Sequence, residues 1–191
     1  MHNGIIENHN ALRDRFKAAG HIFKSDTDSE VLAHLVEANY KGDLLAAVKK
    51  SLKEVDGTYG ITCMVKDEPG VLVVARSGSP IVIGLGDDET IVASDASAII
   101  TYTRQAIYLD DNDIARIEGS KVDIESLDSG AVTRATSEID WSPDAAEKGG
   151  YEHYMLKEIF EQPEAIKNTI RGRLDLNRGT AILSGLNLTP R

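Results

Sequence analysis

The feature that most constrains this chain is a change in the spacing of its apolar residues near residue 57. Before it, apolar side chains recur every three or four residues, as Leu44, Val48 and Leu52 do, which is the period of an amphipathic helix. From Thr58 onward they recur at every second residue, which is the period of a strand. Helices in one block followed by strands in another predict an α+β fold.

The helices predicted before this change have recognisable ends. Residues 8–19 form the first, with Gly20 placed to end it. Thr27-Asp28-Ser29-Glu30 has the spacing of a capping box and predicts the start of a second helix, which ends near Lys41-Gly42. Asp43 caps a third helix, which Asp56-Gly57 ends. No strand is predicted before Thr58.

The strands predicted after Thr58 are short and separated by turn residues. They cover residues 58–66, 71–76, 81–85, 90–94, 106–109, 113–118 and 121–126, with a short helix from 94 or 95 to about 102. The turns Glu68-Pro69-Gly70 and Ser77-Gly78-Ser79-Pro80 are tight, so we expect the strands on either side of each to be antiparallel neighbours. Segments 71–75 and 81–85 are apolar at consecutive positions, which predicts a sheet covered on both faces.

A second unit is predicted after a polar segment at residues 137–150, which contains proline and ends in Gly149-Gly150. We therefore expect domains at residues 1–148 and 149–191. Residues 151–170 carry an apolar stripe at helical spacing that requires a partner surface, and Pro163 either kinks this helix or opens another.

Composition excludes several classes of function. The formal net charge of −10 repels phosphate backbones and anionic lipid headgroups, so we expect neither nucleic acid nor a membrane as a partner. The longest apolar stretches are about five residues, and a bilayer span needs roughly 20. The first four residues do not resemble a signal peptide. A cytoplasmic protein is expected.

Cysteine and histidine usage predicts no metal and no cofactor. Cys63 is the one cysteine, which excludes an internal disulfide and a cysteine-rich zinc site. The histidines at positions 2, 9, 21, 34 and 153 lack the paired spacing of a metal motif. Cys63 lies among apolar residues of a predicted strand, where a thiol is most often a small buried hydrophobe rather than a nucleophile.

The pair Asn3-Gly4 and the residue Asp28 each have two interpretations. Asn-Gly is first a turn signal, although a side-chain amide beside a glycine N–H also provides two donors that form an oxyanion hole. Asp28 complements the dipole of the helix that it begins, and at the edge of a pocket its carboxylate would hold the ammonium group of an amino acid. Residue spacing does not decide between these interpretations.

A resemblance to a known family covers most of the chain. It is carried, in order, by HNGIIENHNALR (2–13), SDTDSEVLAHL (25–35), VVARSGSPIVIGLG (73–86), IVASDASA (91–98) and KGGYEHYMLKEIFEQPEAIKNTIRGR (148–173). These segments closely resemble the glutamine–fructose-6-phosphate aminotransferases, also called glucosamine-6-phosphate synthases. The last segment distinguishes this family from other class II glutamine amidotransferases.

The resemblance implies a fold and a reaction. The fold is a partial αββα sandwich of the N-terminal-nucleophile hydrolases, in which two antiparallel sheets lie between layers of helices. In that family an N-terminal cysteine attacks the side-chain amide of glutamine, and its own amino group is the base. The ammonia converts fructose 6-phosphate into glucosamine 6-phosphate, a step of hexosamine biosynthesis, and leaves L-glutamate.

By the same resemblance, Asn3 and Gly4 supply the oxyanion hole and Asp28 binds the α-ammonium of L-glutamine. The family's N-terminal cysteine and Arg-Trp-x-Thr-His loop have no counterpart here. Residues 1–148 thus resemble the C-terminal part of the glutamine amidotransferase domain, and residues 149–191 the linker and first helices of a truncated sugar-isomerase domain.

Three expectations follow from this truncated pattern. The chain by itself is expected to be inactive. The alternative is a non-catalytic regulatory module that still binds glutamine or glutamate, or a domain whose missing half comes from another polypeptide. We also expect a homo-oligomer, because the family dimerises and a sheet with missing strands leaves unpaired edges.

Overall fold

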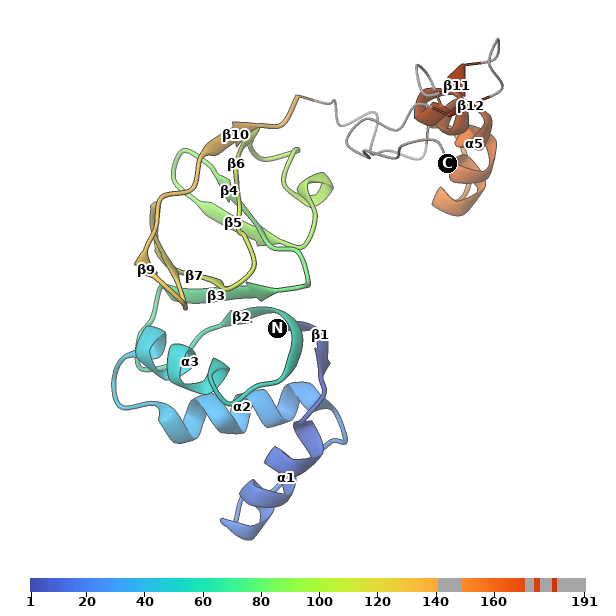
Figure 1. The fold of residues 1–191 in the computed structure, drawn as a ribbon. Helices are drawn as coiled ribbons and strands as arrows, with labels where there is room; N and C mark the ends of the chain where they lie inside the picture. The colour runs from blue at the N-terminus through green and yellow to red at the C-terminus, as the bar shows by residue number, and fades with distance from the viewer. Residues whose placement is uncertain (141–148, 171–173, 176–179, 182–191) are drawn as a thin grey trace. The chain divides into compact units, whose positions relative to one another are not determined.

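The computed structural model describes residues 1–140, 149–170, 174–175 and 180–181 (Figure 1). The chain divides into the units Met1–Trp141 and Ser142–Arg191. Helices of the first unit are α1 (His9–Ala18), α2 (Asp28–Asn39), α3 (Leu44–Leu52) and the 3₁₀ helix η1 (Ala96–Ala98). The domain boundary predicted at 148/149 falls at the edge of a segment outside the described residues, and it stays a prediction.

The strands of the first unit form two antiparallel sheets. The larger, sheet A, has the order β1-β2-β3-β7-β8-β9. Its strands are β1 (His2–Ile6), β2 (Gly57–Cys63), β3 (Val71–Ser77), β7 (Asp113–Glu118), β8 (Lys121–Ser126) and β9 (Gly130–Ala131). Sheet B has the order β10-β6-β4-β5. Its strands are β10 (Thr136–Glu138), β6 (Gln105–Tyr108), β4 (Val82–Leu85) and β5 (Thr90–Ala93).

Sheet A is apolar on both faces, as its sequence predicts. In β3, Val73 and Ala75 join the core cluster formed with helices α1, α2 and α3, whereas Val74 joins the cluster formed with sheet B. In β7, Ile114 and Ala115 divide in the same way. Figure 1 shows α1 to α3 on one side of β2 and β3, and β4 to β6 on the other. The first unit is therefore a partial αββα sandwich, which confirms the predicted fold class.

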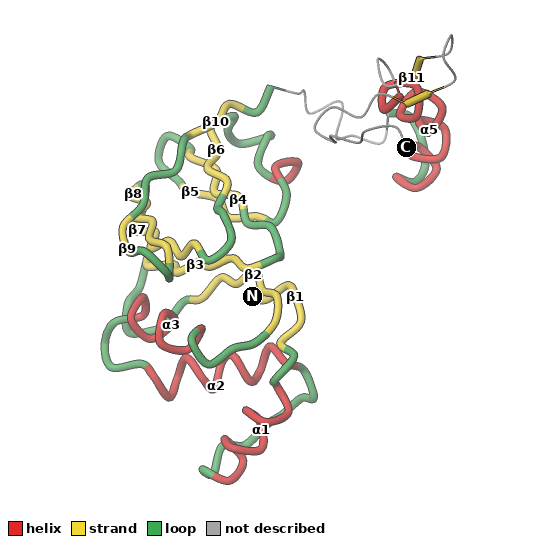
Figure 2. Tube along the Cα trace, viewed as in Figure 1, coloured by secondary structure: helices red, strands yellow, loops and turns green. Residues whose placement is uncertain are grey.

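The three predicted helices are present, and the signals at Gly20 and Asp43 act as expected. In Figure 2 the helices are drawn in red; α2 and α3 lie beside the strands of sheet A, and α1 lies beyond α2. Gly20 follows α1 with φ +91°, and the Asp43 side chain accepts a hydrogen bond from the Ala46 amide at the start of α3. The capping box predicted at the start of α2 is wrong. Glu30 instead accepts hydrogen bonds from the Lys24 and Ser25 amides, because its side chain reaches the preceding loop.

The prediction that no strand precedes Thr58 is wrong, and so is the turn interpretation of Asn3-Gly4. Both residues lie in β1, where Asn3 is opposite Gly60 and Gly4 is opposite Tyr59. This pairing joins residues far apart in the sequence, so local spacing carries no signal for it. Within such a short segment, the Asn-Gly pair outweighs the alternation of a strand in any local interpretation.

The turn Ser77-Gly78-Ser79-Pro80 does not join neighbouring strands, which corrects a second prediction. β3 pairs with β2 and β7, whereas β4 pairs with β5 and β6 in the other sheet. The chain therefore crosses from sheet A to sheet B at this turn. The helix predicted from residue 94 or 95 to 102 is a short 3₁₀ helix, begun by the Asp95 side chain, which accepts from the Ser97 amide.

The second unit contains helix α5 (Tyr154–Ile170) and the short strands β11 (Leu174–Asp175) and β12 (Thr180–Ala181). Pro163 lies inside α5, so it does not open a second helix. Most of the predicted apolar stripe is exposed in α5, as at Met155 and Ile159.

The two-faced core makes a stability prediction. Ile114 is fully buried in β7, so Ile114→Ala should lower the free energy of unfolding by about 2–5 kcal/mol through lost burial and the cavity left behind. Ile22→Ala, at a side chain that is 80% exposed, should change it by less than about 0.5 kcal/mol. Urea denaturation monitored by circular dichroism measures both. Equal losses in the two variants would contradict this placement of the core.

Candidate functional site

The site predicted from the sequence lies at one edge of sheet A. β1 is the terminal strand in the order of the described strands. The Met1 amino group donates to the Thr62 carbonyl at 2.7 Å, and the Thr62 amide donates to the Met1 carbonyl at 3.0 Å. Backbone hydrogen bonds alternate along an antiparallel pair, so the N–H groups of Gly4 and Ile6 point away from β2. They face the open edge.

Asp28 occupies part of this edge from the first turn of α2. Its Oδ2 accepts a hydrogen bond from the Ile6 amide at 2.9 Å, and its Oδ1 lies 3.8 Å from Nδ1 of His2. The same His2 nitrogen is 2.9 Å from the Ser29 hydroxyl oxygen. Two of the predicted site residues, Gly4 and Asp28, therefore lie along one short stretch of β1.

Only glycine fits at position 4. Its φ is +135°, a region that side chains with a Cβ rarely adopt. A Cβ there would lie 2.2 Å from the Thr58 carbonyl oxygen, which belongs to the paired strand. Close pairing of β1 with β2 therefore depends on the missing side chain. The sequence predicted a role for the N–H group of this glycine. The structure adds that a side chain at this position would collide with the paired strand.

The Asn3 side chain has a different position from the other two. It is exposed, and strand alternation places it on the face of sheet A opposite to the His2 ring, which contacts Asp28. A ligand that touches the Asn3 amide, the Gly4 N–H and the Asp28 carboxylate together must therefore lie across the open edge of β1.

The electrostatics of this edge favour an ionised carboxylate beside a neutral imidazole. Burial lowers the pKa of His2 more than the nearby Asp28 carboxylate raises it. Burial alone would raise the pKa of Asp28, but the Ile6 and Ser29 amide hydrogen bonds, together with His2 and His9, outweigh it and leave this pKa below its ordinary value. Asp28 is thus a fixed negative charge near neutral pH.

The loop before α2 is held by a buried arginine that residue spacing did not single out. Arg13 is 7% exposed, and its guanidinium donates to the Ser25 and Thr27 carbonyls at 2.7 and 2.8 Å. These bonds set where α2 begins and so position Asp28. His2 was also missed, although it is the neighbour of Asn3. Neither contact has a local sequence signal, because each joins residues at least a dozen positions apart.

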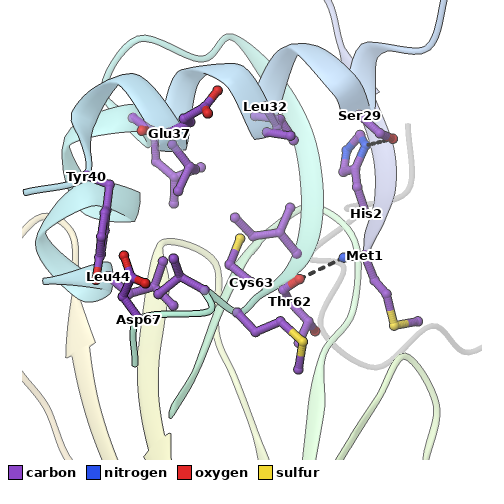
Figure 3. A pocket seen from close by; sticks show the side chains of 17 residues that line it. Met1, His2, Ser29, Leu32, Glu37, Tyr40, Leu44, Thr62, Cys63 and Asp67 are labelled. Carbon is purple, nitrogen blue, oxygen red and sulfur yellow. Dashed lines mark hydrogen bonds between the residues drawn. The ribbon is translucent and has the colours of Figure 1, made fainter. Parts of the chain in front are cut away.

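A cavity of about 530 Å³ lies beside this edge, between α2, α3 and β2 (Figure 3). His2 and Ser29 line it, but Asn3, Gly4 and Asp28 do not. In Figure 3 the side chains of Leu32 and Cys63 point into the space between α2 and β2. Burial raises the pKa of the Cys63 thiol, and the residue packs against the helix-side core. The cavity is therefore lined mainly by apolar side chains and lies next to the candidate site without containing its predicted residues.

The His2 environment makes a prediction about pH. The unfolded chain protonates His2 below about pH 6.5, whereas the folded chain does so only at lower pH, so stability should fall as the pH falls through this window. His2→Gln should therefore reduce the loss of unfolding free energy between about pH 7 and about pH 5. Denaturant titrations at both pH values measure this.

His153→Gln is the control for that measurement, because the His153 side chain is 73% exposed and lies in the other unit. The low pKa of Asp28 gives a separate loss of stability at still lower pH, below the carboxyl's ordinary value of 3.8. An unchanged pH dependence in His2→Gln would contradict the prediction.

Comparison with known proteins identifies the family. Residues 1–101 match the family model described as a glutamine amidotransferase domain. Glutamine–fructose-6-phosphate aminotransferase (isomerizing) of Thermus thermophilus is 48% identical over 191 residues, which is all of this chain and 31% of that protein. The same enzyme of Idiomarina loihiensis is 52% identical over 176 residues, 91% of this chain and 29% of that protein.

Two solved structures have a similar fold. Glutamine phosphoribosylpyrophosphate amidotransferase from B. subtilis, complexed with ADP and GMP, superposes with a TM-score of 0.59 at 26% identity. The superposed region covers 66% of this chain and 28% of the B. subtilis chain. A structure described as the allosteric regulatory enzyme of purine biosynthesis gives a TM-score of 0.56 at 28% identity, with 66% and 27% covered.

The chain thus spans about a third of the length of the relatives that it matches. The match to the family model and the similarity along the whole chain agree with the partial sandwich of the first unit. The protein belongs to the glutamine amidotransferase domain family and is similar to the glutamine–fructose-6-phosphate aminotransferases.

Proposed function

We propose that this chain is part of the glutaminase domain of an enzyme that converts fructose 6-phosphate and L-glutamine into glucosamine 6-phosphate and L-glutamate. The observation that carries the proposal is the shared open edge of β1, toward which the Gly4 N–H points and where the Asp28 carboxylate lies. The similarity to aminotransferases of that printed name supports the choice of acceptor. On this proposal the sugar-phosphate site would lie outside this chain.

Each proposed contact has a chemical reason. Attack on the glutamine amide puts negative charge on its carbonyl oxygen, and the Asn3 side-chain amide with the Gly4 N–H would supply two donors to it. The α-ammonium of glutamine is a cation that an ionised carboxylate binds strongly. Asp28 has its pKa held down by the Ile6 amide and His2 despite its burial, so it offers that charge near neutral pH.

The role of Asp28 is tested with Asp28→Asn, which keeps an oxygen to accept the Ile6 N–H but removes the charge. Charged hydrogen bonds contribute about 1.5–3 kcal/mol, so affinity for L-glutamate or L-glutamine should fall about 10- to 100-fold. Isothermal calorimetry measures this. Asp26→Asn is the matched control, because that side chain is fully exposed and lies two residues away.

The outcomes of that titration separate the proposals. Binding that weakens in Asp28→Asn and persists in Asp26→Asn supports the amino-acid pocket. Equal affinity in both variants would exclude Asp28 as the partner of the ammonium group. No binding by the unaltered chain would favour an inert fragment over a retained pocket.

We further infer that the chain by itself does not hydrolyse glutamine. Cys63 is its one cysteine, and burial raises the pKa of this thiol, which keeps it in the weakly nucleophilic protonated form. The thiol also packs against the helix-side core rather than at the open edge of β1. A nucleophile would have to come from residues outside this chain.

An assay of glutamate release from glutamine should therefore find no turnover above the buffer rate. Cys63→Ser, which removes the thiol and nearly keeps its size, should give the same result. Turnover that disappears in Cys63→Ser would show that Cys63 is a nucleophile and overturn the inference. Turnover that appears only when a second polypeptide is added would agree with it.

A regulatory module that binds glutamine or glutamate without hydrolysis is the second candidate. The polar edge of β1 favours this candidate, because Asp28 is held there by the Ile6 amide whereas Cys63 is half-buried against the helix-side core. Binding in the calorimeter together with no turnover in the assay is what this candidate requires. Binding that appears only with a second polypeptide would instead favour a glutaminase domain completed by that partner.

Partners and location stay predictions. Self-association is supported by exposed apolar side chains at Met1 and Ile5 of the first unit, and by others on α5. Those on α5 are Tyr154, Met155, Leu156, Ile159, Phe160, Ile166 and Ile170. Among the described residues, none of the helices has the length and apolar character that a bilayer crossing demands. The cytoplasmic location and the absence of nucleic-acid binding were predicted from composition alone.

A further inference from the structure

Two histidines and a glutamate meet at the surface of the first unit. His21 lies in the loop after α1, and His34 and Glu37 lie one turn apart on α2. Nδ1 of His21 is 3.0 Å from Nδ1 of His34. Oε2 of Glu37 is 3.5 Å from the His34 nitrogen and 4.0 Å from the His21 nitrogen. Three atoms that can ligate a metal therefore lie within 4.0 Å of one another.

The spacing of these atoms matches a transition-metal site. From the three separations, the point equidistant from all of them lies about 2.1 Å from each atom. Zinc binds histidine nitrogen at about 2.0–2.1 Å and carboxylate oxygen at about 2.0–2.2 Å. The triangle needs little rearrangement to hold such an ion. Magnesium and calcium prefer oxygen ligands, so two imidazoles disfavour them.

The surroundings hold the two rings in place and leave one side open to water. The ring of Phe16 packs edge-on against His21 at 4.9 Å, and the ring of Phe23 lies 4.4 Å from His34. The side chains of His21 and His34 are 25% and 17% exposed, and that of Glu37 is 72% exposed. A water molecule can therefore occupy a fourth position on the ion.

A second carboxylate lies near the other ring nitrogen of His34, beyond hydrogen-bond distance. Oε1 of Glu30 lies 3.8 Å from Nε2 of His34, the ring nitrogen that does not face the site. Histidines that bind metals commonly direct their other N–H toward a carboxylate.

We propose that His21, His34 and Glu37 form a binding site for Zn²⁺ or a similar divalent transition-metal ion, which ties the loop after α1 to α2. The 3.0 Å separation also allows one ring to donate a hydrogen bond to the other. Metal binding replaces that hydrogen bond. Both Nδ1 atoms then present lone pairs to the ion, and each ring carries its proton on Nε2.

Calorimetric titration of the full chain, free of affinity tags and of metal, with ZnCl₂ tests the proposal. One equivalent should bind. Glu37→Gln should weaken binding by about tenfold or more, and because the Glu37 side chain is mostly exposed this change leaves the packing intact. His34→Gln should abolish binding, and MgCl₂ should not bind at this site. His153→Gln, at an exposed histidine of the other unit, should bind like the unaltered chain.

Two results would overturn the proposal. One is the lack of any one-equivalent binding of Zn²⁺. The other is an affinity that Glu37→Gln leaves unchanged, which would show that the ion binds elsewhere. Should His34→Gln not fold, Glu37→Gln decides the matter. A rise in melting temperature with Zn²⁺ that Glu37→Gln removes would show that the ion stabilises the link between α1 and α2.

Discussion

The apolar character of sheet A on both faces is the constraint on which the rest of the first unit depends. Val73 and Val74 are adjacent in β3, and both are fully buried, one under the helices and the other under sheet B. Ile114 and Ala115 repeat this in β7. A sheet of this kind is stable only with a cover on each face, because exposing either would return buried apolar surface to water. Helices α1 to α3 cover one face of sheet A, and sheet B covers the other.

The helix layer in turn brings Asp28 to the edge of β1. Leu32 and Leu35 pack α2 into the core shared with β2 and β3, and this sets where the first turn of α2 lies. Arg13 then fixes the preceding loop through its carbonyl groups. The Asp28 carboxylate satisfies the Ile6 amide, which no strand pairs. The Asp28 carboxylate thus accepts the unpaired N–H of β1 and places a negative charge at this edge.

Local patterns predicted most elements of the first unit, and the two errors in how its strands pair share one cause. Helices α1, α2 and α3 and strands β2 to β8 follow from side-chain spacing, because each buries a face whose period is visible in its own residues. β1 was missed since its partner comes more than fifty residues later. The crossing at Ser77–Pro80 was interpreted as a hairpin, because a turn sequence does not reveal which sheet the next strand joins. The roles of Asn3, Gly4 and Asp28 in the candidate site were inferred from the family resemblance, and they stay predictions.

The sequence by itself determined the α+β class, the two-faced sheet and the family, since these depend on residue types in order along the chain. Only the tertiary structure decided which groups meet. His2 reaches Asp28, and His21 reaches His34, through the packing of α1 and α2 against sheet A. The physical reason is that the distance between two side chains depends on the packing of whole elements. Spacing along the chain records the period of one element and contains no measure of that packing.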